Sequence, residues 1–260
     1  MTIRDIIAPI EAFAPLSLQE SYDNAGLVVG RLDDELQGGV LLAVDVTEKV
    51  IEEAVEKGCG LIITHHPIIF HPLKRLNSAS VVERCVEMAI RNNIALYACH
   101  TNLDSAKGGM SWRVGEMLGL QDMEILQPTS ENAGFGVVGT LPESMDETAF
   151  LCKFKQTFSV ETLRHSALLG REVRRVAICT GAGASLMREA RASQCDIYLT
   201  ADLKYNDFYT PDSHFVVVDM GHFESEFCVI AILFDILSKI FINFALYKSA
   251  QSENPVHYFV

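Results

Sequence analysis

Metal-binding side chains follow three strand-like runs of this sequence. His65 and His66 come after residues 61–64, His100 and Asp104 after residues 94–99, and His222 and Glu226 shortly after residues 215–219. In α/β proteins, ligands gather beyond the carboxyl ends of the strands, so these side chains are predicted to share one site. Imidazole nitrogen and carboxylate oxygen suit zinc, iron or manganese.

The adjacent pair His65 and His66 suggests more than one ion. Pro67 favours extended backbone at His66, and neighbouring side chains of an extended chain point to opposite sides. The two imidazoles are therefore expected to address different positions, as two ions about 3.5–4 Å apart would require. The alternative is one ligand beside one structural histidine, and the dipeptide alone does not decide between them.

The other candidates have ordinary explanations beside the functional one. His222 and Glu226 are four residues apart at the start of an expected helix and share a face, but such pairs are also common on solvated helices. Asp104 is placed to bridge two metal ions, or else to cap a helix or form an Asx-turn. His100 is expected beside the ligands, where it would orient one of them, and is the first candidate for a catalytic role.

Alternating strands and helices position these residues. The first half predicts strands at 39–44, 61–64 and 94–99 with helices at 48–57 and 80–92, a pattern typical of parallel α/β layers. The second half predicts strands at 135–141, 173–179, 196–200 and 215–219 with helices at 145–157, 184–193 and 223–239. Residues 121–134 are expected to be a linker. We therefore expect two α/β lobes, 1–125 and 126–260, with mainly parallel or mixed sheets flanked by helices and the metal cleft between them.

Composition narrows the class of protein. The chain has 260 residues, of which 49% are hydrophobic, and a formal net charge of −13. That charge argues against a general binder of nucleic acid or membrane surface, although metal ions could still attract an anionic substrate. Seven scattered cysteines and an N-terminus unlike a signal peptide indicate a cytoplasmic protein with reduced thiols. Residues 229–246 contain charged side chains and are not expected to span a membrane.

Four short motifs follow one another along the chain: D-N-A-G-L at 23–27, I-T-H-H-P at 63–67, H-T-N-L-D at 100–104 and G-H-F-E-S-E at 221–226. Together they closely resemble the family of GTP cyclohydrolase I type 2 homologs, also described as NGG-interacting-factor-like dinuclear-metal proteins. The resemblance spans nearly the whole chain and is to the short form, which lacks an inserted domain.

The resemblance implies a two-lobed subunit of a toroidal homohexamer with a dimetal centre. His65, His66, Asp104, His222 and Glu226 match the family's metal ligands, with Asp104 as the bridging carboxylate. Ala201 and Asn206 depart from a family segment that usually reads T-G-D/E-x-K-Y-H, so any proton transfer by that histidine would be lost here. Tyr22 stands where relatives often have tryptophan.

Two functions of different classes remain open. The first is a metal-dependent hydrolase acting on a nucleotide or a related small molecule, as the family name suggests, with two divalent ions per subunit. The second is a non-catalytic metal-binding or metal-storing protein, or a ring-shaped interaction protein. A purely structural role for the histidines is the remaining alternative. The glycine-containing run at 181–185 is expected to be a tight turn rather than a phosphate site.

Overall fold

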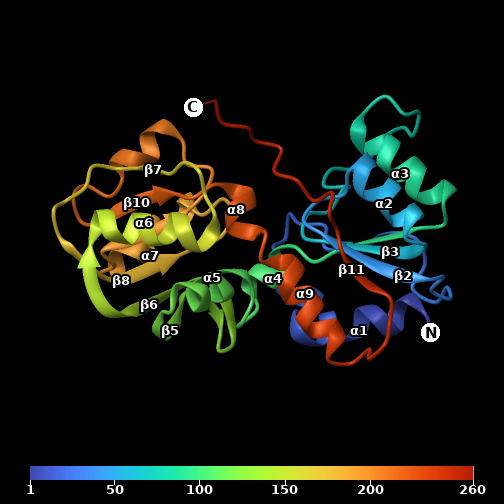
Figure 1. Ribbon diagram of the computed structural model, residues 1–260, viewed down its shortest axis with the longest axis horizontal. Helices are drawn as coiled ribbons and strands as arrows, with labels where there is room; N and C mark the ends of the chain where they lie inside the picture. The colour runs from blue at the N-terminus through green and yellow to red at the C-terminus, as the bar shows by residue number, and fades with distance from the viewer. Residues whose placement is uncertain (260) are drawn as a thin grey trace. The chain divides into compact units, whose positions relative to one another are not determined.

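A computed structural model of the protein describes residues 1–259 and divides them into two compact units (Figure 1). The first unit combines Met1–Ala106 with Val229–Glu253, and the second contains Lys107–Cys228 and the residues from Asn254 onward. The expected division into 1–125 and 126–260 therefore differs from the division by contacts. The reason is that a late helix, residues 229–238, and a late strand, residues 246–248, belong to the first unit, where the helix buries apolar side chains and the strand pairs with an earlier strand.

The first unit is built on a five-stranded sheet in the order β1-β4-β3-β2-β11. Its strands are β1 (Gly26–Val29), β2 (Gly39–Ala43), β3 (Cys59–Thr64), β4 (Ala95–Ala98) and β11 (Leu246–Lys248). β1 is antiparallel to β4, whereas β4, β3, β2 and β11 are parallel. β2 and β3 are buried along their whole length, which explains their nearly continuous apolar sequence.

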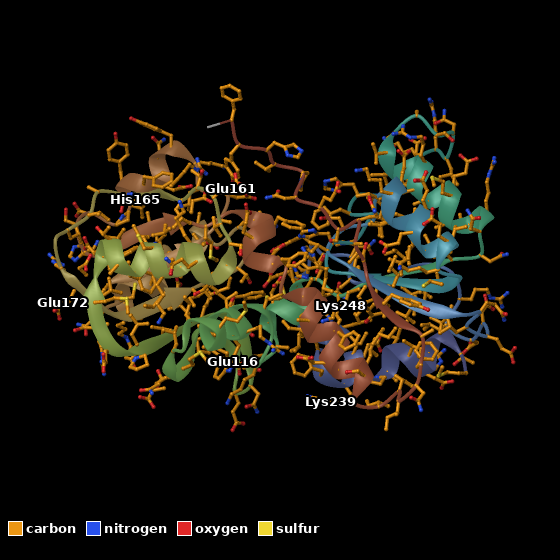
Figure 2. The ribbon with its side chains drawn as sticks, in the orientation of Figure 1. Glu116, Glu161, His165, Glu172, Lys239 and Lys248 are labelled. Atoms are coloured by element: carbon orange, nitrogen blue, oxygen red, sulfur yellow. The ribbon has the colours of Figure 1, made fainter. Side chains whose placement is uncertain are left out.

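Helices cover both faces of this sheet. α2 (Glu48–Glu56) and α3 (Val81–Arg91) lie on one face, and α1 (Ile3–Phe13) and α9 (Val229–Ser238) lie on the other (Figure 1). α2 and α3 begin where the sequence predicts, because the side chains of Thr47 and Ser80 accept hydrogen bonds from amides of the first turn. β11 is joined to α9 by Lys248, whose Nζ lies 4.4 Å from the centroid of the Phe234 ring (Figure 2). η1 (Leu16–Leu18) and the short α4 (Thr101–Ser105) complete the unit.

The second unit contains a six-stranded mixed sheet in the order β5-β6-β8-β9-β10-β7. Its strands are β5 (Gln121–Ser130), β6 (Ala133–Asp146), β7 (Arg164–His165), β8 (Glu172–Ile178), β9 (Ile197–Thr200) and β10 (Val216–Asp219). β8, β9 and β10 are parallel, and the remaining pairs are antiparallel. The prediction of a linker at 121–134 is wrong, since this segment forms the β5–β6 hairpin. Its polar residues fit a strand at the edge of the sheet, where most of them are exposed.

The helices of the second unit also lie on both faces of its sheet. α5 (Met110–Leu118) and α6 (Glu147–Phe158) pack on one face, and η2 (Ala184–Leu186) with α7 (Met187–Ala192) on the other. η3 (Tyr205–Tyr209) and α8 (His222–Glu226) follow β9 and β10. The single helix predicted at 223–239 is wrong, because a turn at Phe227 and Cys228 separates α8 from α9. Within residues 1–259, none of the helices has the length and hydropathy needed to cross a membrane.

Candidate metal centre

Three histidines gather at the carboxyl ends of two neighbouring strands in the first unit. His65 follows β3 directly, His66 is the next residue, and His100 lies just beyond β4. Each offers one ring nitrogen, and these nitrogens lie within 4.8 Å of one another. The ends of the two strands therefore bring these side chains together, and the group is able to hold a metal ion. It includes His100, which the sequence places beside the ligands rather than among them.

The backbone of the His65–His66 pair departs from the expected alternation. The amides of both residues donate to the carbonyl oxygen of Val44, each at 3.1 Å, so the chain bends where the strand ends. The ring centroids are 4.8 Å apart with planes inclined by 53°, so the two imidazoles lie close together beyond the strand. That they address two different metal positions stays a prediction.

Each of these imidazoles is held at Nδ1 by an oxygen atom. His65 Nδ1 donates to the carbonyl oxygen of Cys99 at 2.8 Å, and His66 Nδ1 lies 2.7 Å from Asp45 Oδ1. His100 Nδ1 lies 2.6 Å from Asp23 Oδ1. An imidazole that donates through Nδ1 keeps its lone pair on Nε2, the atom available to a metal ion. Such contacts are the usual way in which ligand histidines are oriented.

The carboxylate of Asp23 is well suited to this role. Burial raises its pKa, but hydrogen bonds from His100 and Thr101 outweigh burial and lower the pKa to about 2. Asp23 is therefore ionised at neutral pH and accepts a hydrogen bond from His100 Nδ1. The backbone amide of Thr101 also donates to Asp23 Oδ2 at 3.1 Å, so the loop before β1 and the start of α4 are joined at this point.

Asp104 lies near the same group. It is inside α4, so it caps no helix, and its amide donates to the carbonyl oxygen of His100 at 3.2 Å. Its Oδ2 lies 3.8 Å from His65 Nε2. The short helix therefore carries a carboxylate back towards the histidine group, as a ligand role requires.

His222 and Glu226 form a second pair of potential ligands, on α8 in the second unit. His222 Nε2 lies 3.1 Å from Glu226 Oε2, and the Glu226 side chain is only 4% exposed. A solvated surface pair would not bury its carboxylate, so the ordinary interpretation does not apply. His222 Nδ1 lies 2.9 Å from Asp202 Oδ2, the same kind of contact that holds the other three histidines.

The charge of His222 follows from these contacts. Burial lowers its pKa, but the hydrogen bonds and negative charges of Glu226 and Asp202 outweigh burial and raise the pKa to about 9. At neutral pH the ring is therefore a cation paired with two carboxylates. A metal ion at Nε2 would replace that proton as the positive charge between the carboxylates.

The turn after β8 shapes the position of Glu226. Gly181 has φ +64°, and a Cβ atom there would lie 2.4 Å from Glu226 Oε1. The amides of Gly181 and Gly183 donate to the hydroxyls of Ser225 and Thr200, each at 2.9 Å. Because these two amides are already engaged, the turn supports the Glu226 carboxylate rather than presenting them to a phosphate.

Asp219 is the last residue of β10, and its carboxylate accepts hydrogen bonds from backbone amides near α8 instead of joining the ligand groups. It accepts hydrogen bonds from the amides of Leu203 and Gly221 at 3.0 and 3.1 Å and pairs with Arg164.

Across residues 1–259, the other four histidines belong to no group of three potential ligands; they are His71, His165, His214 and His257.

Sequence reasoning missed the oxygen atoms that hold the imidazoles. Asp45 lies just beyond β2 and Asp202 just beyond β9, so the strand-end argument used for the histidines would have identified both. Asp23 lies within a recognised motif, but nothing in its spacing indicates a contact with His100, 77 residues away. The carbonyl oxygen of Cys99 has no sequence signal.

Comparison with known proteins places these motifs in a family. The chain is 35% identical over 241 residues to a GTP cyclohydrolase 1 type 2 homolog of Clostridium perfringens, covering 88% of each chain. It is 33% identical over 261 residues to the homolog of Lactococcus lactis, covering 99% of each. A Bacillus cereus protein related to NIF3 has the same fold, with a TM-score of 0.92, 24% identity and coverage of 100% of this chain and 99% of the other. The family model Duf34/NIF3 (NGG1p interacting factor 3) matches residues 1–255, and the chain belongs to this family.

Proposed function

We propose that this protein binds two divalent metal ions through His65, His66, Asp104, His222 and Glu226, and that it hydrolyses a nucleotide or a related small molecule. One observation carries the metal proposal. Every histidine in the two ligand groups is held at Nδ1 by an oxygen atom, at 2.6–2.9 Å. Structural histidines have no need of a common tautomer, whereas ligands that bind through Nε2 do.

The donor set fits borderline divalent ions such as zinc, iron or manganese. It combines imidazole nitrogens with the carboxylates of Asp104 and Glu226, and it contains no thiolate.

Bound ions would supply Lewis acidity, which polarises the bond under attack and acidifies a water molecule. The residues of the chain prepare the site for that chemistry. Asp23, Asp45 and Asp202 hold the rings in one orientation, and the buried Glu226 carboxylate keeps His222 in place. His100 is the side chain proposed to accept and return a proton, at Nε2, while Asp23 holds its Nδ1 proton.

The proposed substrate class, a nucleotide, rests on the names of the relatives and on charge rather than on the histidine contacts. The relatives carry the name GTP cyclohydrolase 1 type 2 homolog, which points to a purine nucleotide. A dimetal site would also attract phosphate groups to a chain whose net charge is −13. The family resemblance further predicts a homohexamer, which sedimentation of the purified protein would test.

Metal analysis followed by turnover tests the proposal. Protein loaded with zinc, iron or manganese is expected to hold close to two ions per chain and to hydrolyse GTP or a simple phosphoester. His65→Ala and Glu226→Gln should lose metal and activity. His165→Ala and Glu161→Gln are matched controls, since both residues are exposed and lie outside the ligand groups (Figure 2).

The outcomes separate the alternatives. Activity that survives both ligand substitutions would refute the dimetal hydrolase. Two ions per chain without turnover of any substrate would indicate the non-catalytic metal-binding protein. A chain that keeps no stoichiometric metal after dialysis would mean that the histidines are structural.

A further inference from the structure

Two exposed aromatic side chains, Tyr22 and Phe70, stand beside the histidine group of the first unit. Tyr22 is 64% exposed and Phe70 39% exposed. Their ring centroids are 6.5 Å apart with planes at 61°, and Phe70 lies 6.1 Å from the His100 ring at 87°. We propose that these two rings, here called the aromatic corner, bind the planar nitrogen-containing ring of a nucleobase next to His100. The inference rests on the proposed function and names the part of the substrate that this face recognises.

The angle between the rings suits a flat ligand. A planar ring that stacks on Phe70 or on Tyr22 meets the other ring edge-on. Offset stacking and edge-to-face contact are the two favourable arrangements of aromatic pairs. A base stacked on an aromatic side chain gains binding free energy with little dependence on which base it is.

The corner is held rigidly in relation to the histidines. Asp23, next to Tyr22, is fixed by His100 and Thr101. Asn24 Nδ2 donates to the carbonyl oxygen of Ile69 at 2.6 Å, directly before Phe70. Both loops are therefore joined to each other and to His100, so the rings lose little freedom when a ligand binds.

Charge favours the base over the phosphate as the group bound here. The loops 19–27 and 65–71 contain no lysine or arginine, whereas Glu20 and Asp23 flank Tyr22 in sequence. An anion would meet no side-chain ammonium or guanidinium group from these two loops. A ring with amino groups instead finds aromatic faces near Glu20, which is partly exposed, so we assign amino-substituted bases, such as guanine, to the corner.

Equilibrium binding to the metal-loaded full chain tests the inference. Guanosine has the ring without a phosphate, and ribose 5-phosphate has the phosphate without the ring. Tyr22→Leu/Phe70→Leu removes both rings but keeps apolar volume, and should weaken guanosine binding by about tenfold or more. Tyr22→Phe should retain the affinity. The matched control is Tyr205→Leu/Tyr209→Leu, an aromatic pair that is 76% and 69% exposed, with ring centroids 5.6 Å apart.

Metal content keeps the two proposals distinguishable. If the double leucine variant binds two ions and guanosine as the wild type does, the aromatic corner is refuted while the metal site stands. A wild type that binds ribose 5-phosphate but not guanosine would refute the corner in the same way. A change in sedimentation with unchanged guanosine affinity would assign the rings to contact with a second copy and would also overturn the inference. A wild-type chain without metal would remove the proposed function and this inference with it.

Discussion

Gly181→Ala provides a sharp test of the second ligand pair. The new Cβ would lie 2.4 Å from Glu226 Oε1, whereas ordinary contact begins near 3.4 Å. The carboxylate or the backbone must therefore move by about 1 Å. The backbone cannot easily move, because the Gly181 amide donates to Ser225 Oγ and its carbonyl oxygen accepts from the amide of Ala201, both at 2.9 Å. The carboxylate is expected to shift, and His222 with it.

Two effects of this substitution must be separated. The φ of +64° adds backbone strain of about 1–2 kcal/mol for any residue with a Cβ. Gly170→Ala carries the same strain at φ +69°, in the same unit, but its Cβ would meet no atom within 4 Å. Gly181→Ala should lose at least as much stability to urea as Gly170→Ala, because it carries the same strain and the contact with Glu226 as well. Only Gly181→Ala should also bind zinc or manganese more weakly, by about 10- to 100-fold, the usual cost of disturbing the support of a ligand.

Isothermal titration of metal into the apo protein measures the difference. The reasoning fails if Gly181→Ala binds metal as tightly as Gly170→Ala, because then the Glu226 carboxylate either is not a ligand or tolerates a shift of 1 Å. Equal losses in both variants would attribute the effect to backbone strain alone.

Two further substitutions probe the support of the site and of the fold. Asp202→Asn removes the charge that holds His222 Nδ1 and should weaken metal binding by about 10- to 100-fold in the same titration, with Asp207→Asn as control. For Glu53, burial raises the pKa, but hydrogen bonds from Ser249 and the amides of residues 250 and 251 outweigh burial and lower it. Its stabilisation is therefore complete above the unfolded pKa of about 4.5 and is lost as the pH falls through the lower folded pKa. Glu53→Gln should lower stability at pH 7 by about 1.5–3 kcal/mol and flatten its decline in acid; an unchanged acid profile would contradict this.

The elements that the sequence predicts well have strong local signals. β2, β3 and β4 are apolar runs bounded by caps and turns, and their predicted positions agree with the structure to within about two residues. The strand predicted at 135–141 lies within β6, but β5 was missed because an exposed edge strand tolerates polar side chains that are otherwise typical of linkers. The break between α8 and α9 was missed because Phe227 and Cys228 continue the apolar pattern through the turn.

The site could be predicted in part for a similar reason. Strand ends bring His65, His66 and His100 together in the way the sequence indicates, because parallel strands end at one edge of the sheet. The bend at His65 depends on a carbonyl oxygen of β2's continuation, Val44, which no local pattern reveals. Gly181 also looks like part of an ordinary turn in the sequence, and only its closeness to Glu226 shows why a side chain does not fit there.

Burial explains which oxygen atom holds which imidazole. The His65 side chain is 0% exposed, and its Nδ1 is held by a neutral carbonyl, so no buried charge has to be stabilised. The His66 side chain is 26% exposed and its partner Asp45 39% exposed, so water solvates that carboxylate in part. The Asp23 side chain is 0% exposed. Its carboxylate oxygens accept hydrogen bonds from His100, Thr101 and the amide of Asn24, and these stabilise the buried charge. Because Asp45 contacts His66 and not His65, substitution of Asp45 should weaken metal binding at His66 without disturbing the buried His65 ring, as titration of metal into the apo protein would show.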